Sequence, residues 1–327
     1  ALSSAASDVY KRQLLDEDHI LGFDEIEVSK DDAKCKLAEK WMQKTATDSE
    51  LQVNEDDTQI HIKGREFAYT IDRRTALFTE MKFAGREYLN HPMELNIWRA
   101  PTDNDMYIKA EWKKAHYDKA YTRAYTTEVV QGKHGVKIVS HASVVAETVQ
   151  KILDVTITWK IDASGKIDAD IEATKDGEFP DLPRFGVRMF LNKKLSDARY
   201  FGMGPQESYR DKHQAASHGL YRANVRDLHE DYIRPQENGS HYDCGYVELN
   251  NSRYGIVASA EKAFSFNASY YTQEELEKKT HNYELIESDS VVFCVDYALN
   301  GIGSNSCGPV VLEQYRFDDV LFRFQFT

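Results

Sequence analysis

Apolar and polar residues alternate along much of the chain, beginning near Thr58. Alternation of this kind places one set of side chains on a buried face of a strand and the other set towards water. Turn-forming residues such as Asp162–Gly165 stand between the alternating segments. The pattern predicts a mostly antiparallel all-β protein with long loops and with strands in the segments Ile60–Lys63, Phe67–Ile71, Val155–Ile161, Ile167–Ile171, Phe185–Leu191 and Phe322–Phe326.

Helical patterns are few. Glu111–Lys119 is one candidate, and Thr272–Glu275 fits a capping box whose helix would continue through Leu276–Thr280. Strands and helices do not alternate regularly along the chain, so the sequence argues against a TIM barrel or a Rossmann domain.

The first fifty residues differ from the rest of the chain. Residues 1–13 are small and polar without a period, and we interpret them as a leader that is foreign to the domain or disordered. Residues 14–50 contain one strand pattern at Ile20–Val28, followed by a charged linker. A strand that has lost its sheet leaves backbone groups unpaired, so we expect this one to be displaced or to pack on a neighbour. Residues 51–327 are predicted to form one β-sandwich domain.

Charge and cysteine content narrow the class of protein. The chain carries 41 basic and 54 acidic residues, a net charge of −13, which argues against binding to nucleic acid or to an anionic membrane surface. No apolar run approaches the roughly 20 residues of a membrane-spanning helix. Cys35, Cys244, Cys294 and Cys307 form no CxxC pair, so free thiols are expected. We expect a cytoplasmic protein; a periplasmic or secreted one stays open, because the natural N-terminus is not visible.

Candidate chemistry centres on one pair of carboxylates. Asp103 and Asp105 follow the apolar strand end Ile97–Pro101, where they could line a site or form a structural turn; both interpretations stay open. Asn54-Glu55, the only Asn-Glu dipeptide, lies in a polar run and is interpreted as a solvated linker. The spacing of the histidines and cysteines predicts no metal site.

Five stretches in order resemble one family. They are Ile97–Asp105 (IWRAPTDND), Phe201–Asp211 (FGMGPQESYRD), Arg234–Gly239 (RPQENG), Phe264–Tyr270 (FSFNASY) and Gly301–Pro309 (GIGSNSCGP). Together they are similar to the C-terminal domain of large bacterial β-galactosidases of glycoside hydrolase family 2. In heterodimeric relatives this domain is a separate small chain. The strand at Ile20–Val28 resembles the last strand of the immunoglobulin-like domain that precedes it.

The resemblance implies a fold, and it implies which domain of the enzyme carries the catalytic residues. The fold would be an antiparallel β-supersandwich similar to the galactose-mutarotase fold, with few short helices. In the family the catalytic glutamates and the magnesium and sodium sites belong to a barrel domain. This chain has no barrel, so we expect no catalytic residue, metal or other cofactor in it.

The resemblance also implies the substrate-binding residues. They are Asp103, Asp105, Met106 and Tyr107, on a mobile loop that runs to Ile108 and looks shorter than in the best-known member, and Cys307, which replaces an indole platform. A thiol cannot stack on a sugar as an indole does.

The function implied is that of a non-catalytic accessory domain or small chain of a β-galactosidase, which hydrolyses terminal β-D-galactosides such as lactose. Its partners would be the catalytic barrel domain or large chain and the galactoside, within an oligomer. One alternative is a free-standing aldose 1-epimerase, which needs a histidine and a glutamate; His241 is the nearest candidate and is interpreted as a loop histidine. The other is a carbohydrate-binding module, which needs a row of exposed aromatic side chains.

Overall fold

The computed structural model describes residues 2–7, 20–26 and 51–327, and these residues form four antiparallel sheets. The predicted all-β antiparallel class with few short helices is confirmed. Two α-helices are present in the described residues, α2 (Ile108–Lys114) and α3 (Gln273–Lys278). In this part of the chain no helix is both long and apolar enough to cross a lipid bilayer.

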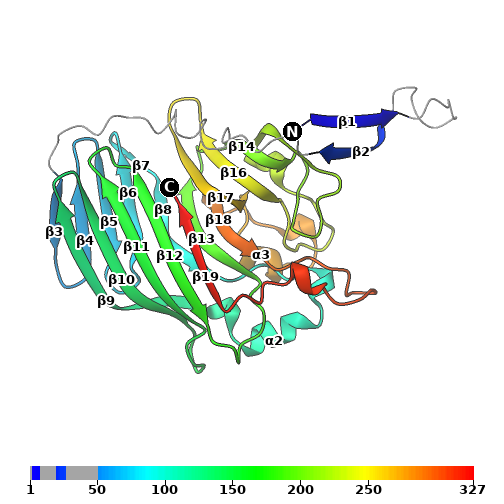
Figure 1. Cartoon of the computed structure of the whole chain (residues 1–327), viewed down its shortest axis with the longest axis horizontal. Helices are drawn as coiled ribbons and strands as arrows, with labels where there is room; N and C mark the ends of the chain where they lie inside the picture. The colour runs from blue at the N-terminus through cyan, green and yellow to red at the C-terminus, as the bar shows by residue number, and fades with distance from the viewer. Residues whose placement is uncertain (1, 8–19, 27–50) are drawn as a thin grey trace.

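Two of the sheets have five strands and face each other (Figure 1). The first contains β3 (Gln52–Glu55), β4 (Gln59–Lys63), β5 (Phe67–Asp72), β6 (Leu77–Phe83) and β7 (Arg86–Glu87) in sequence order. The second has the order β19-β12-β11-β10-β9, with the bounds β9 (Tyr121–Gly132), β10 (Gly135–Val145), β11 (Leu153–Asp162), β12 (Ile167–Lys175) and β19 (Leu321–Phe326).

The third sheet has seven strands in the order β15-β14-β16-β17-β18-β13-β8. Their bounds are β8 (Leu89–Asn96), β13 (Arg184–Asn192), β14 (Asp197–Gly204), β15 (Ser217–Asn224), β16 (Ser240–Asn250), β17 (Gly255–Ser269) and β18 (Ser290–Leu299). Short 3-10 turns lie at η1 (Asp103–Asp105), η2 (Tyr117–Lys119), η3 (Val225–Leu228), η4 (Asn282–Glu284) and η5 (Glu313–Tyr315).

The sheet of β9–β12 and β19 packs against both the β3–β7 sheet and the seven-stranded sheet. Towards the β3–β7 sheet, the rings of Phe78 and Trp159 lie 4.9 Å apart and the Trp159 indole N–H donates to the Ala76 carbonyl at 2.8 Å. Towards the seven-stranded sheet, the rings of Phe185 and Phe322 lie 4.8 Å apart. One cluster of buried apolar side chains therefore runs through all three sheets.

Strand β13 departs from the expected alternation, because both of its faces are covered. Val187, Met189 and Leu191 are buried as the period of two predicts, yet Arg184 and Arg188 on the opposite face are buried as well. The Arg184 guanidinium pairs with Asp296 at 2.6 Å, and Arg188 pairs with Glu274 at 2.9 Å and also with Glu94. Burial of these cations is tolerated because each has carboxylate partners.

Two other segments differ from their prediction. The helix expected at Glu111–Lys119 begins at Ile108 and ends at Lys114, because His116 adopts a left-handed conformation with φ of 57° and the chain continues as η2. Glu55 lies on edge strand β3 rather than in a linker, and it accepts a 2.6 Å hydrogen bond from Arg73. The predicted N-cap of α3 is confirmed, since the Thr272 hydroxyl accepts from the Glu275 N–H, and the helix ends at Lys278, two residues before the expected Thr280.

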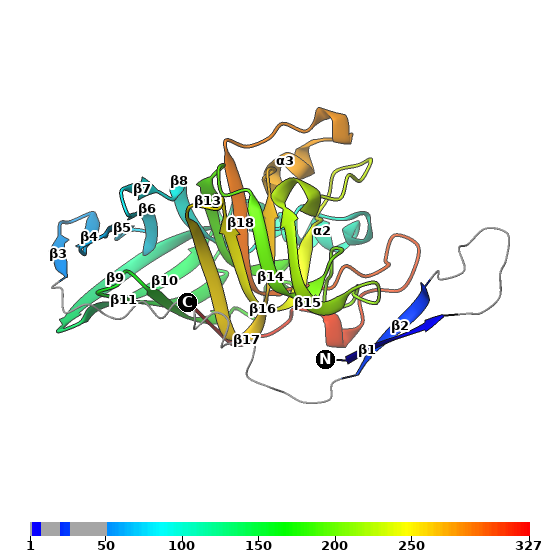
Figure 2. The same cartoon turned by 90° about the horizontal axis from the view of Figure 1, so that it is seen from above.

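The hairpin of β1 (Leu2–Ser7) and β2 (Ile20–Ile26) lies apart from the three sheets, on the side of β15 (Figure 2). The expected strand at Ile20–Val28 is thus paired with part of the supposed leader, while Val28, residues 8–13 and the linker before Leu51 lie outside the described residues. The origin of residues 1–13 and the proposed domain boundaries stay predictions.

His218 on β15 connects the hairpin to the seven-stranded sheet. Its Nδ1 lies 2.8 Å from Glu25 of β2, and its Nε2 lies 2.7 Å from Asp243 of β16. Hydrogen bonds to Asp243 and then to Glu25, only partly offset by burial, raise the pKa of His218 above its ordinary value. Both ring nitrogens donate only in the protonated ring, so these contacts favour imidazolium.

We expect the stabilisation from His218 to be fully present below about pH 6.5 and to be lost as the pH rises through its raised pKa. Denaturant unfolding of the wild-type chain and of His218→Gln, between about pH 6 and pH 9, measures this. The wild-type advantage should shrink with rising pH. An advantage that grows with pH would contradict the assignment.

Trp159→Ala should lower the free energy of unfolding by about 3–5 kcal/mol, because it leaves a cavity in the interface between two sheets and leaves the Ala76 carbonyl without its hydrogen-bond donor. The neighbouring exposed Lys160→Ala should change it by less than about 0.5 kcal/mol. Equilibrium unfolding in urea compares them, and similar losses in both variants would refute this account of the core.

Candidate functional site

The first element of the candidate site is the turn that follows β8. Ile97, Trp98 and Ala100 are buried, and the chain then turns at Pro101 into η1. The Asp105 carboxylate closes this turn, because it accepts hydrogen bonds from the Thr102 backbone N–H at 2.8 Å and from the Thr102 hydroxyl at 3.1 Å. Residues 103–105 therefore form a closed, capped turn rather than the start of a long loop.

A buried ion pair fixes this turn to the body of the protein. Arg99 is fully buried, and its guanidinium donates to Asp105 through Nε at 3.2 Å and through Nη2 at 2.7 Å. The same guanidinium donates to the carbonyls of Asn300 and Gly301, which follow β18. One side chain thus holds the end of β8, the turn and the segment after β18 together.

Asn104 provides a second junction with the segment after β18. Its amide N–H donates to the Gly303 carbonyl at 2.7 Å, and its carbonyl accepts from the Ser306 hydroxyl at 2.8 Å. Asp211, on the segment between β14 and β15, accepts from the backbone N–H groups of Ile302 and Gly303. Elements about 200 residues apart in sequence therefore meet at one edge of the seven-stranded sheet.

The structure brings the predicted substrate-binding residues together but gives them different environments. Asp103, Met106 and Tyr107 are exposed, and Cys307 is an exposed free thiol next to Ser306. Asp105 is 2% exposed, and both of its carboxylate oxygens accept hydrogen bonds from Arg99 or Thr102. Asp105 therefore holds the turn and offers no oxygen to a ligand, whereas the other four lie on an open surface.

The loop expected from Asp105 to Ile108 is short. Only Met106 and Tyr107 stand between η1 and α2, which begins at Ile108. Its mobility stays a prediction.

A polar cavity of about 440 Å³ lies beside this turn. We call it the acidic cavity; its charged and phenolic lining comprises Asp103, Glu207, Tyr209, Asp211, Lys212, Tyr232 and Glu237. The sequence analysis assigned no role to the last six. The sequence did contain a signal for the three carboxylates among them, because Glu207, Asp211 and Glu237 lie within two of the five stretches that resemble the family.

The carboxylates of the acidic cavity are satisfied to different degrees. Glu207 accepts hydrogen bonds from the Lys212 ammonium, from the Tyr232 hydroxyl and from the Gly239 N–H. Glu237 is 4% exposed; its Oε2 lies 3.4 Å from Arg184, and its Oε1 has no hydrogen-bond partner among the described residues. Burial raises the pKa of Glu237, and the nearby Arg184 and Arg99 only partly oppose this.

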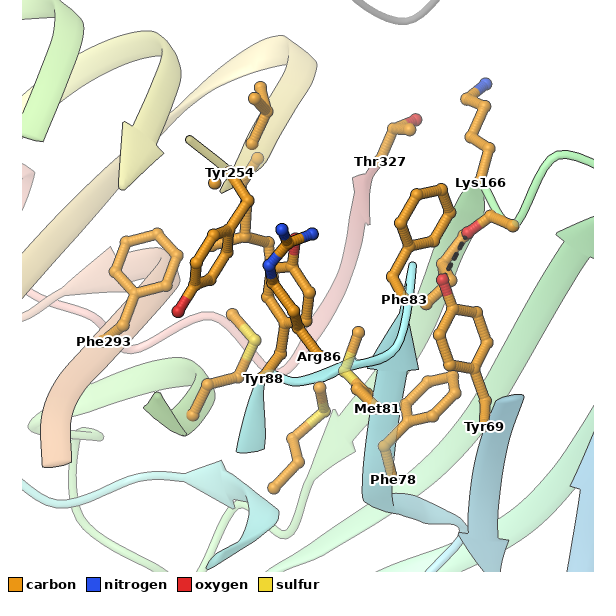
Figure 3. A pocket seen from close by; sticks show the side chains of 18 of the residues that line it. Tyr69, Phe78, Met81, Phe83, Arg86, Tyr88, Lys166, Tyr254, Phe293 and Thr327 are labelled. Carbon is orange, nitrogen blue, oxygen red and sulfur yellow. Dashed lines mark hydrogen bonds between the residues drawn. The ribbon is translucent and has the colours of Figure 1, made fainter. Parts of the chain in front are cut away.

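A larger cavity, of about 490 Å³, lies between the sheets and is mainly apolar (Figure 3). Tyr69, Phe78, Tyr88 and Tyr254 are among its lining residues, and the Arg86 guanidinium lies 5.0 Å from the centre of the Tyr254 ring. Among the described residues, no Asp, Glu or His side chain lines it; its ionisable side chains are those of tyrosine, lysine and arginine.

His241 is on strand β16 and not in a loop. It is 1% exposed, packed between the rings of Tyr200 and Phe266, and burial lowers its pKa to about 4. Neither ring nitrogen has a hydrogen-bond partner among the described residues. A neutral and inaccessible imidazole is a core side chain, so the interpretation of His241 as a loop histidine was wrong.

No group of three or more histidine, cysteine or acidic side chains that could hold a metal ion occurs in residues 2–7, 20–26 and 51–327.

The fold and the junction of Asn104 with Gly303 and Ser306 define an all-β domain with a polar, open edge, which we call the rim. Residues 63–327 match the family model described as "Beta galactosidase small chain". The chain belongs to the β-galactosidase small-chain family, which confirms the resemblance found in its sequence.

Similar curated proteins include two bacterial β-galactosidases. That of Actinobacillus pleuropneumoniae is 42% identical over 314 residues, which cover 96% of this chain and 30% of that protein. That of Staphylococcus xylosus is 31% identical over 323 residues, covering 98% of this chain and 32% of that protein. The chain thus spans about three tenths of the length of these relatives.

Among solved structures, the galactose 1-epimerase from Lactobacillus acidophilus aligns with 85% of this chain and 97% of its own, at 9% identity and a TM-score of 0.38. A 4-alpha-glucanotransferase from Thermococcus litoralis aligns with 86% of this chain and 39% of its own, at 11% identity and a TM-score of 0.36.

Asp105→Asn should lower the free energy of unfolding by about 3–5 kcal/mol, because it leaves the Arg99 charge buried without its partner. Asp103→Asn, two residues earlier in the same motif but 61% exposed, should change it by less than about 0.5 kcal/mol. Urea unfolding of both variants is the measurement. Equal losses would mean that the two aspartates do not differ as their burial indicates.

Proposed function

We propose that this chain completes a β-galactosidase: it docks on a barrel-bearing partner and supplies the rim of the galactoside site without catalysing hydrolysis itself. The observation that carries this is the junction of Asn104 with Gly303 and Ser306, which sets Met106, Tyr107 and Cys307 on one open edge. A rim of exposed side chains without a floor suits half of a site, because ligand sites surround most of their ligand.

The carboxylate chemistry supports an accessory role. Retaining hydrolysis requires a protonated carboxyl group and a nucleophilic carboxylate about 5 Å apart. Asp105 is committed to Arg99 and Thr102, so the Asp103–Asp105 motif cannot supply both. Burial raises the pKa of Glu237, as a general acid requires, but the Glu207 oxygens already accept hydrogen bonds from Lys212, Tyr232 and Gly239.

The two alternatives have little support. An aldose 1-epimerase needs an accessible histidine and glutamate, and His241 is buried between aromatic rings. A carbohydrate-binding module needs a row of exposed aromatic rings. Of the exposed aromatic residues in the described part of the chain, only Tyr121 and Tyr125 lie on the same strand, β9.

A complementation assay tests the proposal. The purified chain should not turn over a chromogenic β-galactoside alone, and mixing it with the part of the Actinobacillus pleuropneumoniae β-galactosidase outside the matched region should raise the rate of that part at least about a hundredfold. Asn104→Ala, which loses the junction, should weaken complementation; Asn90→Ala, whose amide binds Asp289 and Ser290 elsewhere, should not.

Turnover by the chain alone that is abolished by Glu237→Gln would overturn the accessory role. A mixture no more active than the partner alone would also overturn it.

A further inference from the structure

The acidic cavity carries more negative charge than its own cation balances. Asp103, Glu207, Asp211 and Glu237 line it, against a single lysine, Lys212, which is already paired with Glu207. Asp211 accepts only backbone N–H groups in the contacts described above, and Arg234 at the mouth lies 3.9 Å from Asp103 with both side chains more than 60% exposed. Such an exposed pair contributes little.

Glu237 supplies an independent observation at the inner wall of this cavity. The buried cluster of Arg184, Asp296 and Glu237 holds one cation for two carboxylates, and Arg184 lies closer to Asp296, at 2.6 Å, than to Glu237, at 3.4 Å. The other oxygen of Glu237, Oε1, is buried and accepts no hydrogen bond from the described residues. A buried carboxylate oxygen without a donor is costly, so a donor delivered into the cavity would be bound favourably.

Exposed apolar side chains adjoin the acidic cavity. Met106 and Tyr107 follow the η1 turn, and Ile233 follows Tyr232 of the lining; their exposed fractions are 43%, 62% and 77%. Val310 and Leu312, 58% and 60% exposed, flank Val311, which packs on Gly303 of the lining. Exposed Met and Tyr side chains are enriched at protein interfaces, and arginine is among the residues that contribute most to binding there.

We infer that the acidic cavity is the docking site for a cationic side chain, an arginine in preference to a lysine, presented by the barrel-bearing partner. This rests on the proposed function, and it names the chemistry by which the partner is recognised. The planar guanidinium carries five N–H donors, which suit several carboxylate oxygens around one recess.

Affinity for the partner tests this inference. The probe is the same part of the Actinobacillus pleuropneumoniae β-galactosidase, titrated against the chain at several salt concentrations. Wild-type affinity should fall as salt rises. Glu237→Gln should weaken binding about thirtyfold or more, since it removes the charge of a desolvated pair, and should flatten the salt dependence.

Asp103→Lys keeps the test valid if Glu237→Gln fails to fold. Asp103 is exposed at the mouth, so reversing its charge should leave thermal unfolding unchanged while slowing association and weakening binding. Glu66→Gln, an exposed acid in the turn between β4 and β5, is the matched control and should bind as the wild type does.

The outcomes separate the inference from the proposed function. If the wild-type chain binds and activates the partner but a folded Glu237→Gln or Asp103→Lys does so equally well, only the inference is overturned. If the wild-type chain does not bind the partner, the proposed function is overturned and the inference with it. Saturable binding of lactose to the chain alone, lost in Glu237→Gln, would overturn the inference in favour of a sugar.

Discussion

The buried guanidinium of Arg99 is the constraint on which the open edge of the protein depends. Removing a cation from water is costly, and it is tolerated only where the geometry of its partners is nearly complete. Here Asp105 and two backbone carbonyls, those of Asn300 and Gly301, surround the charge. These partners come from the turn after β8 and the segment after β18, so the cost of burying the charge is offset only when both segments are in place. Asn104 and Ser306 then complete the rim.

A second buried cation gives the neighbouring cavity its character. Arg184 lies on the face of β13 that alternation alone would turn towards water, and it is covered by β18 and the segment before β16. Arg184 lies closer to Asp296 than to Glu237, and Oε1 of Glu237 has no hydrogen-bond partner among the described residues. This buried cluster therefore holds one guanidinium for two carboxyl groups beside the acidic cavity.

These features are consistent with the proposed docking of this domain on the surface of a partner domain. Its core is a continuous set of three packed sheets, and its candidate site lies where loops from distant parts of the chain meet. The chain spans about three tenths of its β-galactosidase relatives, so in the proposed assembly the remaining part supplies the catalytic groups. A domain in this position needs rigidity at the rim more than reactive groups of its own.

The sequence by itself determined the class of fold, the main strands and the family. A period of two indicates which side chains of a strand face the core. The Thr272 cap and the five ordered stretches can be recognised from residues that are neighbours in the sequence. It could not separate Asp103 from Asp105, two identical residues in one motif, because the difference lies in Arg99 and in carbonyls about 200 residues away. Only the tertiary structure decided that His241 is buried and that one oxygen of Glu237, Oε1, accepts no hydrogen bond from the described residues, since burial and charge compensation are properties of the assembled sheets and not of local pattern.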